Sequence, residues 1–199
     1  MTSRDVILGR IRQALSGGAG PVAVPRDYRR DADKADLDLL VERLVDYKAH
    51  VHVSDDVPGT IAGIAGRGSL VVPPGLPAGW LPDTAAALVD TGLDAGTIAA
   101  ADGVVTAAAV AVAETGTIVL DGSPDQGRRI ISLLPDLHIC VLRREQVVAS
   151  VPEAVARLDP RRPLTWISGP SATSDIELNR VEGVHGPRNL HVIIVEAPA

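Results

Sequence analysis

The last quarter of the chain holds the residues whose types and spacing best suit a chemical site. The small residues 169–173 follow an apolar stretch, and Ser174 and Glu177 have the S-x-x-E spacing that begins a helix. Free N–H groups at a helix start bind anions. Asp175 and Glu177 already place negative charge there, which favours hydroxyl recognition, acid–base chemistry or cation binding over phosphate binding. A well-capped structural helix is the alternative.

Two further residues stand at sharp turns. Glu114 precedes a Thr-Gly pair within the apolar segment 113–120, where desolvation favours acid–base or nucleophilic use of a carboxylate. An exposed charged turn is the alternative for Glu114. His185 lies between two glycines ahead of Pro187. An imidazole at such a turn can act as a general base or contact a ligand, or it can hydrogen-bond to a backbone carbonyl and so fix the loop.

Weaker candidates are a pair of arginines and three histidines. Arg128 and Arg129 suit a carboxylate or a phosphate, but such a pair more often solvates the start of a helix. His50 and His52 share one face of an expected strand, and two imidazoles are too few to indicate a metal site. His191 begins an apolar strand and is expected to be structural or at the surface. We therefore predict no metal ligands.

The composition disfavours several classes of protein. The net charge is −6 and no stripe of Lys and Arg covers the chain, which argues against nucleic-acid binding. The single cysteine, Cys140, excludes an internal disulfide framework and cannot alone hold an iron–sulfur cluster, which typically takes several thiolates. No apolar run reaches about 18 residues, so we expect no membrane span and a cytoplasmic protein.

The elements that position these residues fall into two expected parts. Residues 3–15 have helical periodicity with Ser3 as a cap, and a Gly/Pro-rich, charged segment separates them from the rest. Residues 1–35 are therefore predicted to form a helix and linker arm, and 36–199 the domain. The arm is either a frayed or docked terminal helix or a partner-binding segment.

Within the domain, strand and helix patterns alternate, which is typical of βαβ units and a mostly parallel sheet. The segment 104–123 is either a bent strand pair or an Ala-rich helix leading into a strand. The expected strands are 50–54, 69–74, 136–143, 164–170 and 190–196, and the expected helices are 36–49, 60–66, 83–89, 151–158 and 174–181.

The motifs together resemble the LUD domain of the lactate utilisation protein C family. The similarity rests on A-E-T-G-T at 113–117, L-P-D-L-H at 134–138, S-G-P-S-A-T-S-D-I-E at 168–177 and G-V-H-G-P at 183–187. It extends over most of the expected domain and is strongest from Ala113 onward. The two C-terminal motifs, in this order and spacing, are the specific part of the resemblance.

The resemblance implies an α/β fold, a Rossmann-like α/β/α sandwich similar to the NagB/RpiA/CoA-transferase-like class. It also implies a part in the oxidation of L-lactate to pyruvate with two partner proteins that hold iron–sulfur clusters, while this chain binds no cofactor. The candidates carried over from the motifs are Glu114, Asp175 and His185 for catalysis, and Thr115, Gly116, Gly169, Ser171, Thr173, Glu177 and Gly186 for ligand binding.

Three hypotheses for the function follow. The chain is a cluster-free subunit or accessory protein of an L-lactate-oxidising system, a free-standing enzyme of the acyl-CoA or sugar-phosphate type with Glu114 as nucleophile or base, or a purely structural scaffold.

A shared site would bring the Glu114 turn, the loop 169–175 and the His185 turn into one cleft at the carboxyl ends of the strands. Chain direction opposes the inclusion of His185, because a helix after a parallel strand leads back to the opposite edge.

Overall fold

The main sheet of the domain has six strands, all parallel. The computed structural model describes residues 2–18, 22–27, 35–173, 181–182 and 186–196. In spatial order the strands are β1 (His50–Val53), β12 (Asn189–Val195), β7 (Leu137–Arg143), β4 (Gly103–Ala107), β2 (Ser69–Val72) and β3 (Ala86–Val89). The expected α/β fold with a mostly parallel sheet is confirmed.

A second sheet of four short strands lies against the first. Its order is β8 (Val147–Val148), β5 (Val110–Val112), β6 (Thr117–Leu120) and β9 (Thr165–Ile167), with β6 antiparallel to both of its neighbours. The segment 104–123 is thus formed of strands, which settles the alternative in favour of a strand pair. A further antiparallel pair joins β10 (Ala172–Thr173) to β11 (Val181–Glu182).

The helices are short, and three of them begin at an aspartate whose side chain accepts a backbone N–H of the first turn: Asp36, Asp56 and Asp94. They are α1 (Ser3–Leu15), α2 (Leu37–Asp46), α3 (Val57–Ala65), α4 (Ala95–Ala99) and α5 (Val151–Arg157), with the 3-10 turns η1 (Ala78–Trp80), η2 (Arg129–Ser132) and η3 (Arg144–Gln146). No helix among the described residues is both long and apolar enough to cross a membrane.

Three sequence expectations for the helices need comment. The cap of α1 is Thr2 instead of Ser3, because the Thr2 hydroxyl accepts the Asp5 N–H and the Asp5 carboxylate accepts the Thr2 N–H. The helix expected at 83–89 is wrong, since β3 pairs there with β2 and sheet pairing overrides the local pattern. The helix expected at 174–181 falls outside the described residues, except that Val181 belongs to β11.

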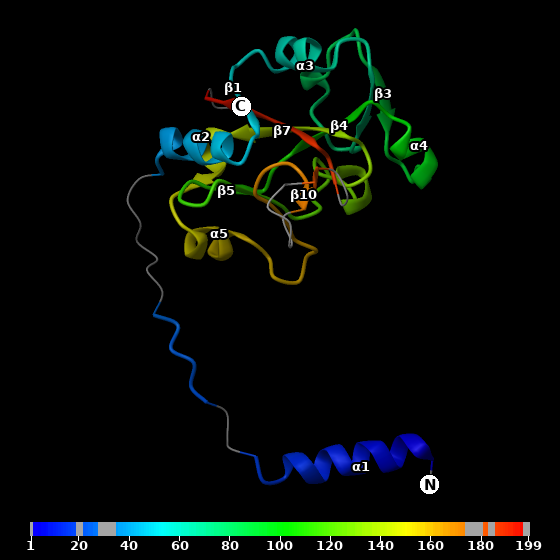
Figure 1. The fold of residues 1–199 in the computed structure, drawn as a ribbon, viewed down its shortest axis with the longest axis vertical. Coiled ribbons are helices and arrows are strands. Elements are labelled where there is room, and N and C mark those ends of the chain that lie inside the picture. Colours follow the sequence, from blue (N-terminus) through cyan, green and yellow to red (C-terminus); the bar gives the residue numbers. More distant parts are fainter. Residues whose placement is uncertain (1, 19–21, 28–34, 174–180, 183–185, 197–199) are drawn as a thin grey trace.

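The core is arranged in layers, which Figure 1 shows with α3 and α5 on opposite sides of the strands. Alternate residues of β7 and β12 face opposite ways. Ile139 and Ile193 pack under Ile61 of α3. Leu142 and Ile194 face the second sheet and α2, and the outer face of the second sheet packs against α5. The second sheet therefore occupies much of the face that helices alone cover in a simple sandwich.

The strand order reverses direction between β2 and β4, the kind of point where open α/β sheets place ligands. From β2 the chain passes outward to β3, and from β4 it passes the other way to β7. The loop 121–127 lies in this crevice. Gly75 N–H donates to Pro124 O (2.9 Å) after β2, and Ala107 N–H donates to Asp125 O (2.9 Å) at the end of β4.

The helix α1 stands apart from these layers. None of its residues is buried, and Ile7, Ile11 and Leu15 are exposed. Figure 1 shows α1 away from the domain. Its existence agrees with the sequence expectation, while the choice between a terminal helix and a partner-binding arm stays a prediction.

Candidate functional site

The turn at 113–117 and the loop after β9 meet through hydroxyl groups. Strands β6 and β9 pair side by side, with Ile118 opposite Ile167. The Thr115 hydroxyl donates to the Thr117 Oγ1 (2.9 Å), and the Thr117 and Ser168 hydroxyls share a hydrogen bond of 2.9 Å. Two of the motifs that carry the resemblance are thus held together by direct contact.

Both segments contain a glycine that lies tightly against the end of α2. Gly116 has φ 60° and Gly169 has φ 91°, conformations that favour glycine. A Cβ atom at Gly116 would lie 2.6 Å from the Arg43 Cβ, and one at Gly169 would lie 2.7 Å from the Tyr47 Cβ. These glycines are needed for packing, whether or not they also approach a ligand.

The carboxylate of Glu114 is engaged with the start of α5. Its Oε1 accepts the N–H of Val151 (2.9 Å), the first residue of α5. The cap residue Ser150 makes no side-chain bond to the helix, so Glu114 supplies an acceptor for one of the N–H groups that a helix start leaves unpaired. Glu114 does not line the cavity that holds Ser168 and Ser171.

The loop after β9 also contacts the segment that leads into β12. The N–H of Ser171 donates to Pro187 O (2.7 Å), and a Cβ at Gly186 would lie 3.5 Å from the Ser171 Cβ. The next residue, Arg188, forms an ion pair with Asp136 (2.5 Å), which precedes β7. The hydrogen bond from the Arg188 side chain is the main cause of the lowered pKa of Asp136. This ion pair joins the L-P-D-L-H motif to the segment before β12, and that segment in turn contacts the loop after β9.

Beneath this loop is a chamber of about 220 Å³ at the amino ends of β7 and β12. His138, the second residue of β7, lines it and is 1 % exposed. Its Nε2 lies 2.8 Å from the Thr106 Oγ1 of β4. Burial lowers the pKa of His138 to about 4, so the imidazole is neutral at pH 7. The other lining residues include Arg129, Ser132, Leu133, Ser168, Gly169, Ser171, Gly186 and Leu190.

The chamber continues into a larger depression of about 570 Å³ along η2. The two share Arg129, Ser132 and Thr165, so they form one cleft between η2 and β9. Arg128 and Arg162 also line the larger part. The cleft thus gathers three arginines in a chain of net charge −6.

Two of these arginines are already paired. Arg128 contacts Asp90 through Nε (2.8 Å) and Nη2 (2.5 Å), and this is the main cause of the lowered pKa of Asp90. Arg162 pairs with Asp121 (2.9 Å). Arg129 contacts no carboxylate among the residues that the structure describes, so its charge is available to a ligand.

A separate depression of about 470 Å³ lies at the carboxyl end of β4, on the other side of the loop 121–127. Its polar groups are largely engaged within the chain: Asp121 N–H donates to Gln126 Oε1 (2.6 Å), and Gln146 Nε2 donates to Ala108 O (2.6 Å). Burial raises the pKa of Asp125, which also lines it. Asp125 is the carboxyl group in the described cavities that is best suited to retain a proton.

The structure places the sequence candidates in three groups. Gly169, Ser171 and Gly186 line the chamber, whereas Glu114, Thr115 and Gly116 do not. Asp175, Glu177 and His185 lie outside the described residues, as does the side chain of Thr173. The roles of all these residues stay predictions.

The position of the loop differs from the sequence expectation. We expected the segment after β9 to lie at the carboxyl edge of the main sheet, but β9 belongs to the second sheet and its loop covers the amino edge. Sequence reasoning also missed His138, although that residue ends the L-P-D-L-H motif. Arg128 and Arg129 were both considered from the sequence. The sequence alone does not reveal that Arg128 pairs with Asp90 whereas Arg129 does not.

A cluster of imidazoles lies on the face of β1 and β12 opposite to the chamber. His52 Nε2 is 3.0 Å from His191 Nδ1, and the rings of His50 and His191 stack at 4.6 Å. Burial and the neighbouring imidazoles lower the pKa of His191 to about 4. The described residues include no group of three or more His, Cys, Asp or Glu side chains placed to hold a metal ion.

Comparison with known proteins places the motifs in a family. The family model described as LUD domain matches residues 96–195. Lactate utilization protein C of Deinococcus radiodurans is 46% identical over 198 residues, which cover 95% of this chain and 93% of that protein. The protein of the same name from Bacillus licheniformis is 35% identical over 100 residues, 46% of this chain and 41% of that protein.

The fold has a match among solved structures as well. The crystal structure of a DUF162 family protein from Deinococcus radiodurans superimposes with a TM-score of 0.70 at 45% identity, over 80% of this chain and 95% of the other.

Proposed function

The chain belongs to the LUD-domain family, and from that premise we propose that it takes part in lactate utilisation as a component of an L-lactate-oxidising system. The observation that carries the proposal is the 46% identity to Lactate utilization protein C over 95% of this chain. The expected site of action is the cytoplasm.

Within that system we propose that this chain is the subunit that holds no iron–sulfur cluster and acts with partner proteins that do. The chemistry of its cysteine supports this assignment. Cys140 is the only cysteine, it is buried, and burial raises its pKa to about 12. Because cluster ligation needs several accessible thiolates, electron transfer belongs to the partners.

A growth experiment tests the proposed role. Deletion of the gene should abolish or strongly slow growth on L-lactate as sole carbon source, and growth on pyruvate should stay normal. The wild-type gene supplied in trans should restore growth. Normal growth of the deletion strain on L-lactate, with no second copy of the gene, contradicts the proposal.

The partnership needs a biochemical test. A tagged chain purified from cells grown on L-lactate should bring down iron–sulfur proteins, detected by their visible absorbance and iron content. Lactate oxidation by the isolated complex should fall when this chain is left out. If the partner proteins oxidise lactate at the full rate without this chain, this chain is not a required subunit of the system.

One observation supports a second candidate function, a free-standing enzyme for a larger anionic substrate of the acyl-CoA or sugar-phosphate type. The depression of about 570 Å³ beside three arginines is within the size range of ligand pockets. An enzyme of this kind would work without the iron–sulfur proteins, so the copurification experiment separates the two functions.

A further inference from the structure

The chamber under the loop 168–171 has two polar groups that the described part of the chain leaves without partners. The first is the guanidinium of Arg129. Its neighbours Arg128 and Arg162 are held by Asp90 and Asp121, whereas no described carboxylate contacts Arg129. An arginine that lines a cavity without a counter-ion suits a carboxylate, because the guanidinium offers two parallel N–H donors.

The second group is the imidazole of His138. Its Nε2 is engaged by the Thr106 hydroxyl, and no described residue hydrogen-bonds to its Nδ1. Because His138 lines the chamber, a ligand there can supply the hydrogen bond that this nitrogen lacks within the described residues. In the tautomer with Nδ1–H it would donate to an oxygen of a ligand, and in the other tautomer it would accept a hydrogen bond from a hydroxyl group.

The size of the chamber limits what these two groups can bind together. A volume of about 220 Å³ equals the space of roughly seven water molecules in the liquid. A carboxylic acid of three or four carbons fits this space and leaves room for a few water molecules. Ser132 of η2 and Ser168 after β9 also line the chamber, so a second oxygen on the ligand would meet polar groups.

We propose that this chamber binds a small 2-hydroxy or 2-oxo carboxylic acid, with its carboxylate at Arg129 and its 2-oxygen at His138. The arrangement of one cation, one neutral imidazole and a small volume supports the class of ligand. The choice of acids to test rests on the proposed role in lactate utilisation. This assignment gives the cluster-free chain a direct contact with the substrate or the product of the system.

Isothermal titration calorimetry on the full chain tests the class of ligand. L-lactate and pyruvate should show saturable binding, and propanoate, which lacks the 2-oxygen, should bind at least tenfold more weakly. Inorganic phosphate is titrated as a control anion, to test whether the chamber prefers a carboxylate to a phosphate. The inference is overturned if neither L-lactate nor pyruvate binds, if propanoate binds as tightly as they do, or if phosphate binds more tightly than either acid.

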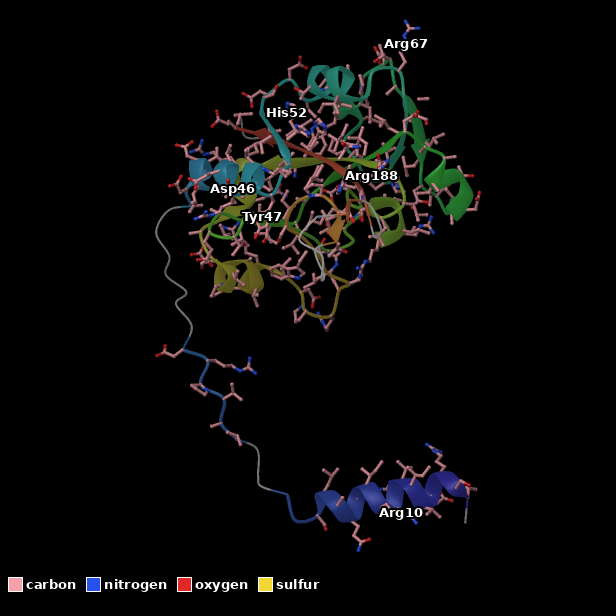
Figure 2. All side chains as sticks on the ribbon, in the orientation of Figure 1. Arg10, Asp46, Tyr47, His52, Arg67 and Arg188 are labelled. Atoms are coloured by element: carbon pink, nitrogen blue, oxygen red, sulfur yellow. The ribbon has the colours of Figure 1, made fainter. Side chains whose placement is uncertain are left out.

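Substitutions of Arg129 and His138 test which group binds the carboxylate of the ligand and which binds its 2-oxygen. Arg129→Gln should weaken binding of every acid at least tenfold, because it removes the charge while keeping much of the side chain. The matched control is Arg67→Gln, an exposed arginine next to the end of α3 that does not line the chamber and should leave affinity unchanged. Figure 2 shows Arg67 at the top of the domain, well away from Arg188, whose neighbour Pro187 lines the chamber. Equal losses in both variants, or none in Arg129→Gln, overturn the assignment.

His138→Gln should reduce the preference for lactate or pyruvate over propanoate to less than threefold. Circular dichroism at the assay temperature checks that this buried variant is folded. If it is not, the imidazole NMR signals of His138 in the wild type are followed instead, and they should shift more with L-lactate or pyruvate than with propanoate. An unchanged preference in a folded variant overturns the role given to His138.

These outcomes are distinct from failure of the proposed function. Loss of growth on L-lactate in the deletion strain, combined with no binding of any acid, rejects the chamber and keeps the role in lactate utilisation. Normal growth of the deletion strain combined with tight acid binding rejects the role and keeps the chamber.

Discussion

The two edges of the main sheet differ in how far their polar groups are satisfied within the chain. At the carboxyl edge, the loop 121–127 lies in the crevice between β2 and β4, where Gly75 and Ala107 donate their N–H groups to it, and Arg128 beside the loop is paired with Asp90. At the amino edge, the chamber below the loop 168–171 leaves Arg129 and His138 Nδ1 without partners among the described residues.

The difference shows why strand direction alone is a poor guide to the site of this fold. The rule that ligands lie at the carboxyl ends of parallel strands holds where that crevice is open. Here a loop of the same chain enters the crevice and leaves a depression on each side, and the second sheet brings the end of β9 over the opposite edge. Polar groups that line a cavity without a partner among the described residues, such as Arg129 and His138 Nδ1, then add evidence that topology does not supply.

The largest expected effect concerns His138 at the amino edge. Its pKa is about 4 in the folded protein and about 6.5 in an unfolded chain. Between these pH values the unfolded chain binds a proton that the folded protein excludes, so the free energy of unfolding falls as the pH falls. The loss is about 1.4 kcal/mol per pH unit at most and on the order of 3 kcal/mol over the window.

Urea unfolding of the wild type and of His138→Gln at pH 7 and pH 4.5 measures this effect. The variant should lose the part of the pH dependence that comes from His138, so the two proteins converge in stability at the lower pH. His52 and His191 also have lowered pKa values but are present in both proteins, so their contribution cancels. Identical pH dependence in both proteins would mean that His138 is not buried as a neutral group.

A smaller effect is expected at the carboxyl edge, where the loop 121–127 is packed. A Cβ at Gly75 would lie 2.6 Å from the Pro124 Cβ and 2.7 Å from the Pro124 backbone. Gly75→Ala should therefore lower the free energy of unfolding by about 2 kcal/mol, since backbone must shift to admit the methyl group. Urea unfolding measures the change, and binding of acids in the chamber should be unaffected.

The control for this variant is Gly63→Ala, in α3. A Cβ there meets no atom within 4 Å, and alanine in a helix is favoured over glycine by up to about 1 kcal/mol. Gly63→Ala should be neutral or stabilising. If Gly75→Ala is as stable as the wild type, the loop 121–127 moves at little cost in free energy. The loop is then not tightly packed against the end of β2, and the contrast between the two edges of the sheet does not hold.

The sequence predicts much of the fold because most elements have local signals. The apolar stripe of α2, the alternation in β1 and the apolar centre of β12 each indicate the element that forms. The helix expected over 83–89 failed because its alanines suit a helix locally while pairing with β2 makes an edge strand. Such a tertiary effect leaves no trace in the local pattern.

The candidate site is less predictable, and the reason is again nonlocal. Gly169 and Ser171 stand in a motif that the sequence shows plainly. His138 looks like one more residue of an apolar strand, and only its place under the loop from β9 makes it part of a cavity. Arg128 and Arg129 are equivalent in sequence, and only the fold pairs the first with Asp90.

The smallest expected effect sharpens the comparison by testing a residue that belongs to neither edge site. A shared site with the loop 169–175 stays a prediction for Glu114, and in the described structure its carboxylate accepts the Val151 N–H at the start of α5. Glu114→Ala removes this acceptor and should cost about 1 kcal/mol of unfolding free energy in urea. Glu114→Gln keeps an oxygen in place, so it should cost less than half as much and support normal growth on L-lactate. If Glu114→Gln is as stable as the wild type yet fails to support that growth, Glu114 takes part in the chemistry, and its contact with α5 is not its main role.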